Sequence, residues 1–213
     1  MTQVQLDVAI VLAAGAGTRM KSDTPKIMHQ IAGRTIIGHV LNEVNLLSPK
    51  DLRVVVGHGR EVVEPHVKEI TPSAKTVFQA EQNGTGHAVQ LALADLSTTG
   101  TVLILAGDTP LLRNETLAEF FEAHSKNNNH ASVLTAELPD PSGYGRIVRN
   151  EDGEIVAIVE ERDATEELKG INEINTGVYL FDIATLKESV KKLKSNNSQG
   201  ELYLTDVIAE IKN

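Results

Sequence analysis

The sequence predicts an α/β fold in which a mostly parallel, Rossmann-like mixed sheet is flanked by helices. Apolar runs without polar alternation recur in the first half of the chain, and such runs are typical of central strands covered on both faces. They span residues 8–12, 52–56, 76–78 and 102–106. Between them lie segments with the apolar period of a helix, at 36–44, 89–96 and 117–124. This alternation indicates βα units, whose ligands bind at the carboxyl ends of the strands.

Each helix is predicted from its apolar positions and from a capping residue ahead of them. Thr35 precedes apolar residues at 36, 37, 40, 41 and 44, Thr85 precedes 89, 92, 93 and 96, and Asn114 precedes 117, 120 and 121. Thr and Asn side chains accept hydrogen bonds from the first N–H groups of a helix, so we expect these three residues to be N-caps.

After about residue 130 the pattern changes to short strands separated by turn residues. The runs are 131–137, 147–149, 155–159 and 176–181, and Asn150–Gly153 is a good hairpin turn. We therefore expect hairpins that extend the sheet, followed by two closing helices around Leu186 and Val207. The whole chain, 1–213, is predicted to be one domain, with a nucleotide-binding half at 1–130 and a substrate-binding half at 131–213.

Composition excludes several classes of protein. The net charge of -9 over 213 residues argues against binding to a phosphate backbone, so no nucleic acid partner is expected. The absence of Cys excludes a disulfide scaffold, a thiolate metal site and a Cys nucleophile. The apolar opening at 8–17 follows Asp7 and contains two Gly, unlike a signal peptide, and no stretch is long enough to span a membrane. We expect a cytoplasmic protein without membrane contact.

The segment L-A-A-G-A-G-T-R-M, residues 12–20, directly follows the first predicted strand. Its small residues let backbone N–H groups approach a phosphate closely. Arg19, Lys21 and Lys26 against Asp23 leave a local charge of +2, which favours an anionic ligand. The segment fits neither the dinucleotide fingerprint nor the P-loop pattern, and a solvated basic turn remains the alternative.

Two further segments follow predicted strands. Asp108 comes after the run 102–106, where a carboxylate suits Mg²⁺, although Asp in this position is also a common turn or cap residue. The stretch 79–87 holds Gln79, Gln82 and Gly84, whose amides and flexible backbone could read a pyrimidine edge; a polar helix N-terminus explains it almost as well.

Polar groups flanked by Gly in the second half could bind sugar hydroxyls. They lie in G-Y-G-R at 143–146, in E-E-R-D at 160–163 and in N-T-G at 175–177. The chain contains neither H-E-x-x-H nor G-x-S-x-G, so it lacks the usual sequence motifs of zinc hydrolases and of hydrolases with a nucleophilic Ser.

In chain order, L-A-A-G-A-G-T-R-M, T-P-K, Q-A-E-Q-N-G-T-G-H-A, L-A-G-D-T-P-L, G-Y-G-R-I, E-I-N-T-G and Q-G-E-L-Y-L-T-D resemble one family. It is the uridyltransferase domain of the bacterial bifunctional N-acetylglucosamine-1-phosphate uridyltransferase / glucosamine-1-phosphate acetyltransferase. The resemblance runs from about residue 7 to 211 and implies a fold of the nucleotide-diphospho-sugar transferase type. The implied reaction joins UTP and N-acetylglucosamine 1-phosphate into UDP-N-acetylglucosamine and pyrophosphate.

The resemblance also implies roles for individual residues. Arg19 and Lys26 would be catalytic and serve the phosphates, and Asp108 would bind the Mg²⁺ cofactor. The remaining substrate-binding residues would be Leu12, Ala13, Ala14, Gly15, Gln79, Gln82, Gly84, Thr85, Ala106 and Gly107 around the nucleotide, and Gly145, Glu160 and Asn175 around the sugar. Some relatives carry Tyr where this chain has Ala106, which removes a sugar-packing surface and leaves the metal position intact.

The chain departs from the family beyond residue 213, where relatives have a second metal-binding Asn in a V-N-x-R segment and the acetyltransferase domain. We therefore expect no acetyl transfer and, without the repeat domain, a monomer or weak dimer. Two alternatives stay open: a nucleotidyltransferase of another sugar or base specificity, and a chain that binds UDP-N-acetylglucosamine with little turnover.

Overall fold

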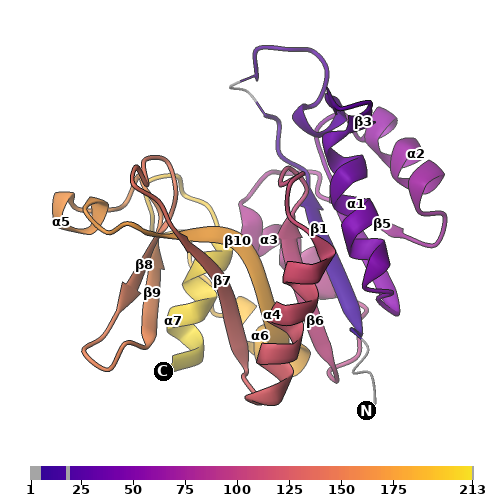
Figure 1. Cartoon of the computed structure of the whole chain (residues 1–213). Helices are drawn as coiled ribbons and strands as arrows, with labels where there is room; N and C mark the ends of the chain where they lie inside the picture. The colour runs from indigo at the N-terminus through magenta and orange to yellow at the C-terminus, as the bar shows by residue number, and fades with distance from the viewer. Residues whose placement is uncertain (1–5, 18–19, 213) are drawn as a thin grey trace.

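β1 (Val8–Ala13) is the first strand of an eight-stranded main sheet in the computed structural model, which describes residues 6–17 and 20–212 (Figure 1). β1 pairs in parallel with β4 (Asp51–Val56) on one side and β6 (Thr101–Ala106) on the other, and β4 pairs in parallel with β5 (Lys75–Phe78). The predicted parallel half of the sheet is confirmed.

The second half of the sheet is antiparallel and is organised by one long strand, β10 (Glu173–Asp182). β10 pairs antiparallel with β6, with β7 (Ala131–Glu137) and with β8 (Arg146–Arg149). β8 and β9 (Ile155–Val159) form the predicted hairpin. The expectation of a hairpin for 131–137 is wrong, because β7 pairs with β10 and not with the next strand. Ten residues give β10 enough length to pair with three strands.

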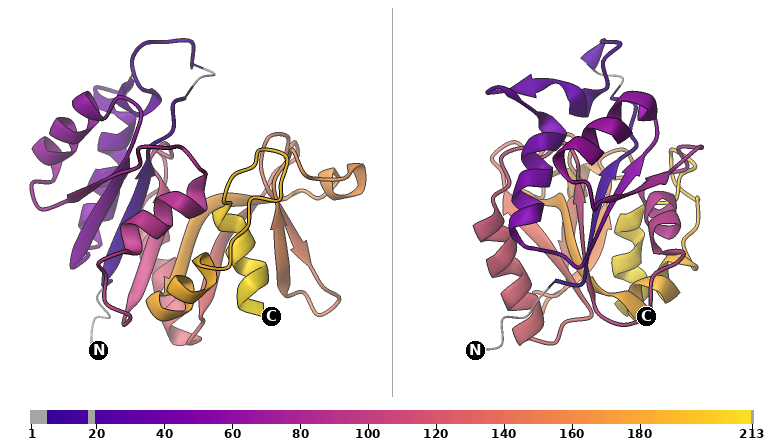
Figure 2. Two further views of the ribbon diagram at one scale, coloured as in Figure 1. Left: turned by 180° about the vertical axis from the view of Figure 1, so that it is seen from behind. Right: turned by 90° about the vertical axis from the view of Figure 1, so that its right-hand side faces the viewer.

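Two helical layers cover the sheet, as Figure 2 shows. The layer against one face comprises α1 (Ile36–Leu46), α2 (Arg60–Ile70) and α4 (Asn114–Lys126), and the layer against the other comprises α3 (Thr85–Leu93), α6 (Ile183–Val190) and α7 (Val207–Lys212). Ala9 and Val11 of β1 pack into the first core cluster and Val8 and Ile10 into the second. Successive strand side chains point to opposite faces, so a strand covered twice must be apolar throughout.

The helix starts differ from the predicted ones in two of three cases. Thr35 caps α1 as expected, since its side chain accepts a hydrogen bond from the N–H of Gly38. α3 and α4 begin at Thr85 and Asn114 themselves, and their N-caps are Gly84 and Arg113. α2 was not predicted from the sequence; it contains Pro65 and only two buried residues. A proline inside a helix removes a hydrogen bond and weakens the pattern.

Short elements complete the chain: η2 (Lys26–Met28), the small sheet of β2 (Gln30–Ile31) and β3 (Arg34–Thr35), α5 (Glu166–Lys169) and η3 (Leu204–Asp206).

The 197–205 loop crosses from the second half of the chain to the segment that opens α3. The N–H of Gly86 donates to the carbonyl of Leu202 (2.7 Å), and the N–H of Leu202 donates to the carbonyl of Asn83 (2.9 Å). The N–H of Leu204 donates to Oγ1 of Thr85 (3.0 Å). Gly84 permits this close approach: its φ is +98°, and a Cβ there would lie 2.4 Å from the Leu202 carbonyl oxygen.

Gly84→Ala is expected to destabilise the fold by about 2 kcal/mol or more, because it combines left-handed backbone strain with a clash against main chain. The matched control is Gly153→Ala, where φ is +79° and no atom lies within 4 Å of the added Cβ. That change should cost only the backbone strain, about 1 kcal/mol. Urea denaturation of both variants measures the difference, and equal losses would contradict the close packing of the 197–205 loop.

Candidate active site

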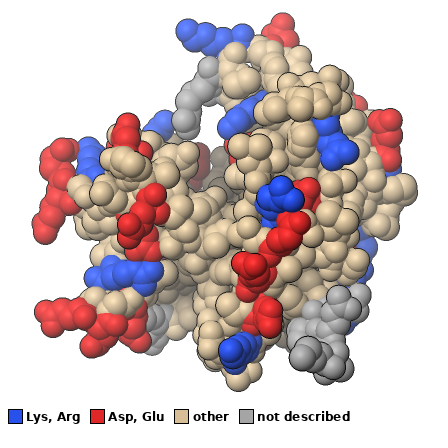
Figure 3. All heavy atoms as spheres, in the orientation of Figure 1, with Lys and Arg blue, Asp and Glu red and all other residues tan. Residues whose placement is uncertain are grey.

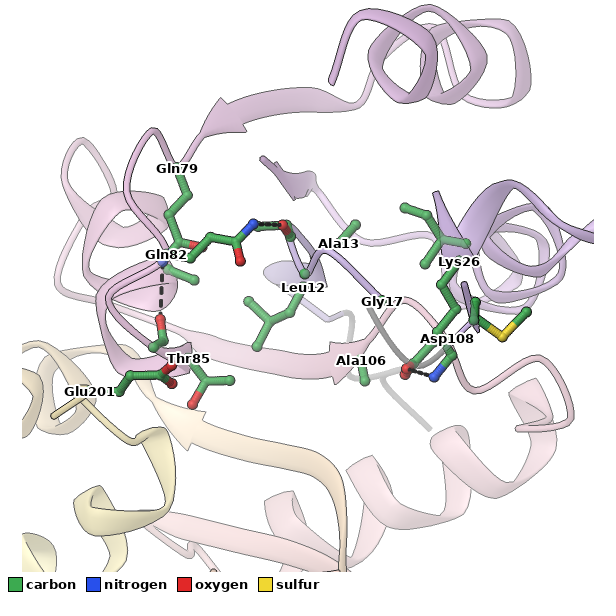
Figure 4. Close-up of a pocket in the computed structure, with 16 residues that line it drawn as sticks. Leu12, Ala13, Gly17, Lys26, Gln79, Gln82, Thr85, Ala106, Asp108 and Glu201 are labelled. Atoms are coloured by element: carbon green, nitrogen blue, oxygen red, sulfur yellow. Dashed lines mark hydrogen bonds and ion pairs between the residues drawn. The ribbon is translucent and has the colours of Figure 1, made fainter. Parts of the chain in front are cut away.

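A cavity of about 540 Å³ lies at the carboxyl ends of β1 and β6 (Figure 4). Predicted site residues that line it are Leu12, Ala13, Ala14, Gly15, Lys26, Gln79, Gln82, Gly84, Thr85, Ala106 and Asp108. They come from segments far apart in the sequence, which the parallel strands bring to one edge of the sheet. The structure therefore brings the predicted nucleotide-binding residues together.

Backbone N–H groups of the loop after β1 are available to a ligand. Among the described residues, the N–H groups of Gly15, Ala16 and Gly17 have no protein acceptor. Gly17 has φ +60°, and a Cβ there would lie only 2.6 Å from Cβ of Lys26, so glycine lets the loop pack against η2. Consecutive unpaired N–H groups beside a basic side chain can bind an anion.

Lys26 and Asp108 form an ion pair at the edge of the cavity. Nζ of Lys26 lies 2.6 Å from Oδ2 of Asp108, and the two side chains are 40% and 36% exposed, so solvent and ligand can both reach them. Gly107, which precedes Asp108, does not line the cavity, but its N–H donates to the Leu12 carbonyl (2.8 Å) and ties the two loops together. Arg19, the other predicted catalytic residue, lies outside the described residues.

The 79–87 segment forms the opposite wall. Nε2 of Gln79 donates to the carbonyl of Gly84 (3.0 Å), and Nε2 of Gln82 donates to the carbonyl of Ala14 (2.9 Å). A carbonyl oxygen can only accept, so these contacts fix which end of each amide faces the protein. The amide oxygen of Gln79 has no hydrogen-bond donor within the part of the chain that the structure describes. It remains available as an acceptor.

Five lining residues were not predicted: Gly17, Met20, Ile27, Ala88 and Glu201. Glu201 is the informative one, because it belongs to the 197–205 loop and so comes from the second half of the chain. Its segment Q-G-E-L-Y-L-T-D is one of the motifs that carried the family resemblance, but no role was assigned to it.

The three predicted sugar-binding residues do not line this cavity and form a second group. A Cβ on Gly145 would lie 3.5 Å from both Cβ of Asn175 and Oε2 of Glu160. The N–H of Asn175 donates to the carbonyl of Gly145 (2.8 Å), and Thr205 donates to Oε1 of Glu160 (3.3 Å). Thr205 ends the loop that carries Glu201, so the 197–205 loop connects the two groups.

Glu160 is a carboxylate in an unfavourable environment. Burial raises the pKa of its carboxyl above the ordinary value, and the nearby charges of Asp206 and Asp163 raise it further. The hydrogen bond from Thr205 opposes this shift. A carboxyl group whose pKa is shifted in this way by burial and by neighbouring charges is typical of a functional position.

Asp108 fits a divalent cation of the Mg²⁺ type. In residues 6–17 and 20–212, no group of three or more His, Cys, Asp and Glu side chains is placed to hold a metal ion. Mg²⁺ does not need such a group, because it binds through one or two carboxylates and fills its remaining positions with water and substrate phosphates. Asp108 stands at a cavity that Gly15 and Gly17 also line, and the N–H groups of these two residues have no acceptor among the described residues. Substrate phosphates bound there would be within reach of an ion on Asp108.

Charges on the outer surface are mixed. On the face drawn in Figure 3, Lys and Arg side chains are interspersed with Asp and Glu, and the surface is hollowed between the lobe of β8 and β9 and the lobe of α1. Among the described residues, no helix has both the length and the apolar composition that crossing a membrane requires.

Residues 9–170 match the family of MobA-like NTP transferase domains. The chain belongs to this family. The protein named bifunctional protein GlmU from Streptomyces avermitilis is 50% identical over 215 residues, which cover 100% of this chain and 45% of that protein. A protein of the same name from Thermobifida fusca is 50% identical over 95% of this chain and 43% of its own length. The resemblance stated from the motifs is confirmed, and the chain spans less than half the length of these relatives.

Solved structures confirm the predicted fold type of this NTP transferase domain. UDP-glucose pyrophosphorylase in complex with UDP-glucose superposes with a TM-score of 0.80 at 20% identity, over 98% of this chain and 88% of the other. The apo form of a UDP-glucose pyrophosphorylase gives a TM-score of 0.78 at 19% identity, over 97% and 86%. At this identity the likeness concerns the fold, which is that of nucleotide-diphospho-sugar transferases.

Glu160→Gln is expected to stabilise the protein at about pH 7.5 relative to wild type. The folded-state pKa of Glu160 is raised, so its stabilising contribution is present below the ordinary value of 4.5 and is lost as pH rises through the folded-state pKa. The amide has no charge to bury, so the advantage of Glu160→Gln should shrink as pH falls toward 4.5. Thermal melting of both proteins across this range measures it.

The control is Glu151→Gln, which removes an exposed carboxylate in the hairpin turn and should change the melting temperature only slightly at about pH 7.5. A Glu160→Gln protein that is less stable than wild type at neutral pH would contradict the burial cost.

Proposed function

We propose that this chain transfers the uridylyl group of UTP to N-acetylglucosamine 1-phosphate, giving UDP-N-acetylglucosamine and pyrophosphate. The observation that carries the proposal is the composition of one cavity. The N–H groups of Gly15 and Gly17, unpaired among the described residues, meet there with the Lys26–Asp108 pair and the amides of the 79–87 segment. The motifs shared with the uridyltransferase domain support the choice of substrates.

The 79–87 segment would select the base. Gln79 keeps its Nε2 on the protein and offers its oxygen as an acceptor. Uracil carries an N–H at ring position 3 that can donate to this oxygen, whereas cytosine has an acceptor there and would be repelled. Leu12, Ala13 and Ala14 at the end of β1 line the cavity together with Gly84 and Thr85.

The phosphates would lie between the loop after β1 and Lys26. The N–H groups of Gly15–Gly17 supply fixed partial charges, and Lys26 and Arg19 supply full ones. Asp108 would hold Mg²⁺ together with the substrate phosphates; the ion, when bound, neutralises charge on the phosphate oxygens.

Gly145, Glu160 and Asn175 would bind the sugar. Glu160 accepts hydrogen bonds from hydroxyls, and Gly145, which has no side chain, lets Asn175 and Glu160 lie close to its backbone. In its charged form Glu160 would hold a sugar hydroxyl more strongly than a neutral acceptor, since hydrogen bonds to charged groups are stronger than neutral ones.

The reaction needs no protein nucleophile. An oxygen of the sugar phosphate attacks the α-phosphorus of UTP, the bond from that phosphorus to the bridging oxygen breaks, and pyrophosphate leaves with the electron pair. The work of the protein is to hold the attacking and leaving oxygens in line and to compensate charge, which Lys26, Arg19 and the loop N–H groups do.

Release of pyrophosphate from a panel of substrates tests this function. UTP, CTP and dTTP are each paired with N-acetylglucosamine 1-phosphate and with glucose 1-phosphate. The pair UTP and N-acetylglucosamine 1-phosphate should give a kcat/KM at least about 10-fold above every other pair. A preference for another pair would favour the same chemistry with other specificity, and calorimetric binding without turnover would overturn the catalytic part.

Asp108→Asn is expected to raise the Mg²⁺ concentration needed for half-maximal activity by at least about 10-fold, because an amide oxygen lacks the charge that offsets dehydration of a hard cation. Asp152→Asn, on the exposed hairpin turn, is the matched control. A Mg²⁺ titration curve that is the same for Asp108→Asn and wild type would leave Asp108 as a structural partner of Lys26.

A further inference from the structure

Tyr179 is a buried phenol in the middle of β10 for which packing alone does not require a hydroxyl group. It is 4% exposed, pairs with Ile104 of β6 and Val133 of β7, and its ring stacks on Phe181 with centroids 5.9 Å apart. Phenylalanine would fill this position with the same ring and without a polar atom to bury. Burying a hydroxyl group is costly unless it is hydrogen-bonded, so the hydrogen bonds of Tyr179 should show why this position carries one.

The hydroxyl group of Tyr179 contacts a residue of the proposed sugar site. Nδ2 of Asn175 donates to it over 2.7 Å, and within the described residues it has no other hydrogen-bond partner. Burial raises the pKa of the phenol well above its usual range, and the charge of Glu160 adds to this shift, so the hydroxyl group stays protonated. The hydroxyl group of Tyr179 therefore contacts Asn175 and interacts electrostatically with Glu160.

The other end of the Asn175 amide is also fixed. Its Oδ1 accepts a hydrogen bond from the N–H of Gly177 (3.0 Å), whose φ is +78°. The pairing of β10 with β7 shifts register between Asn175 and Val178, so the strand is irregular here. This irregularity turns the Gly177 N–H toward the Asn175 side chain.

Two contacts thus determine the orientation of the amide completely. The oxygen faces Gly177 and one N–H faces Tyr179, which leaves the second N–H of Nδ2 free to donate. Cβ of Asn175 and Oε2 of Glu160 each lie 3.5 Å from the position that a Cβ of Gly145 would occupy. A free amide donor and a carboxylate acceptor on the same glycine form a complementary pair for a sugar with both hydroxyl and acetamido groups.

We propose that Tyr179 is a positioning residue, whose hydroxyl group orients the Asn175 amide so that its free N–H points to the sugar phosphate substrate. The proposal rests on the sugar site of the proposed function. Tyr179 touches no reacting atom and acts through Asn175. Without the hydroxyl group, the amide loses the partner that fixes its nitrogen and spends part of its time in other orientations.

The test uses Tyr179→Phe in the full chain. The KM for N-acetylglucosamine 1-phosphate should rise about 3- to 10-fold, the loss expected for one hydrogen bond, while the KM for UTP changes less than about 2-fold. The matched control is Thr71→Val, which removes another buried hydroxyl that also accepts from an amide, Nδ2 of Asn45 at 2.6 Å, at the end of α2. Thr71→Val should leave the KM for the sugar phosphate unchanged.

A double-mutant cycle separates positioning from a purely structural role. If Tyr179 acts through Asn175, adding Tyr179→Phe to Asn175→Ala should change the KM for the sugar phosphate by less than about 2-fold. A full additive effect would overturn the proposal. Phe181→Leu perturbs the same stack without removing a hydroxyl group, so the same rise in that KM from Phe181→Leu would also overturn it.

The Asn175→Ala and Tyr179→Phe variants distinguish an error in the proposed sugar site from an error in the role of Tyr179. If Asn175→Ala leaves the KM for the sugar phosphate unchanged, both the positioning role and the sugar site are wrong. If Asn175→Ala raises it and Tyr179→Phe does not, the sugar site stands and the role of Tyr179 is wrong.

Discussion

The parallel pairing of β1 between β4 and β6 is the constraint on which the rest of the structure depends. Residues Val8 to Leu12 pair one for one with Val102 to Ala106, so the two strands end at the same edge of the sheet. The loop after β1 and the Gly107–Asp108 turn therefore emerge side by side, joined by the hydrogen bond from Gly107 to Leu12. A slip of one residue would separate these loops by about 3.3 Å and exchange the faces of every side chain in β1.

A second level of organisation joins the antiparallel half to this edge. β10 carries Asn175 and pairs with β6, so the proposed sugar site is fixed to the strand that precedes Asp108. The 197–205 loop makes the connection again from outside the sheet, because its adjacent residues Leu204 and Thr205 contact Thr85 and Glu160. The pairing of β10 with β6 consists of backbone hydrogen bonds. The fold sets the directions of these bonds, and dissolved salt weakens them little.

Sequence patterns predicted what depends on local composition. Strand β1 and the loop after it were found because a doubly covered strand is apolar throughout and a phosphate loop needs small residues. The pairing of β7 with β10 was not found, since pairing depends on contacts between residues about 40 positions apart. Glu201 was missed for a similar reason: it reaches the cavity only because Gly84 and Gly86 leave room for its loop. α2 was not predicted because it contains Pro65, which disfavours a helix locally. Packing of Val63 and Val67 into the core offsets the free-energy cost of this proline.

The net negative charge of the protein opposes the binding of an anionic substrate, so groups in the cavity must attract the substrate locally. A chain with a net charge of -9 repels a triphosphate at long range, and Lys26 is already compensated by Asp108. The unpaired N–H groups of Gly15–Gly17 attract phosphate without adding a charge that must be desolvated. In the proposed reaction, Lys26 would turn to a bound phosphate, because its side chain is partly exposed, and Asp108 would then be free to hold a cation. Until then the ion pair keeps both side chains compensated, so the same pair would link the binding of the metal ion to that of the nucleotide.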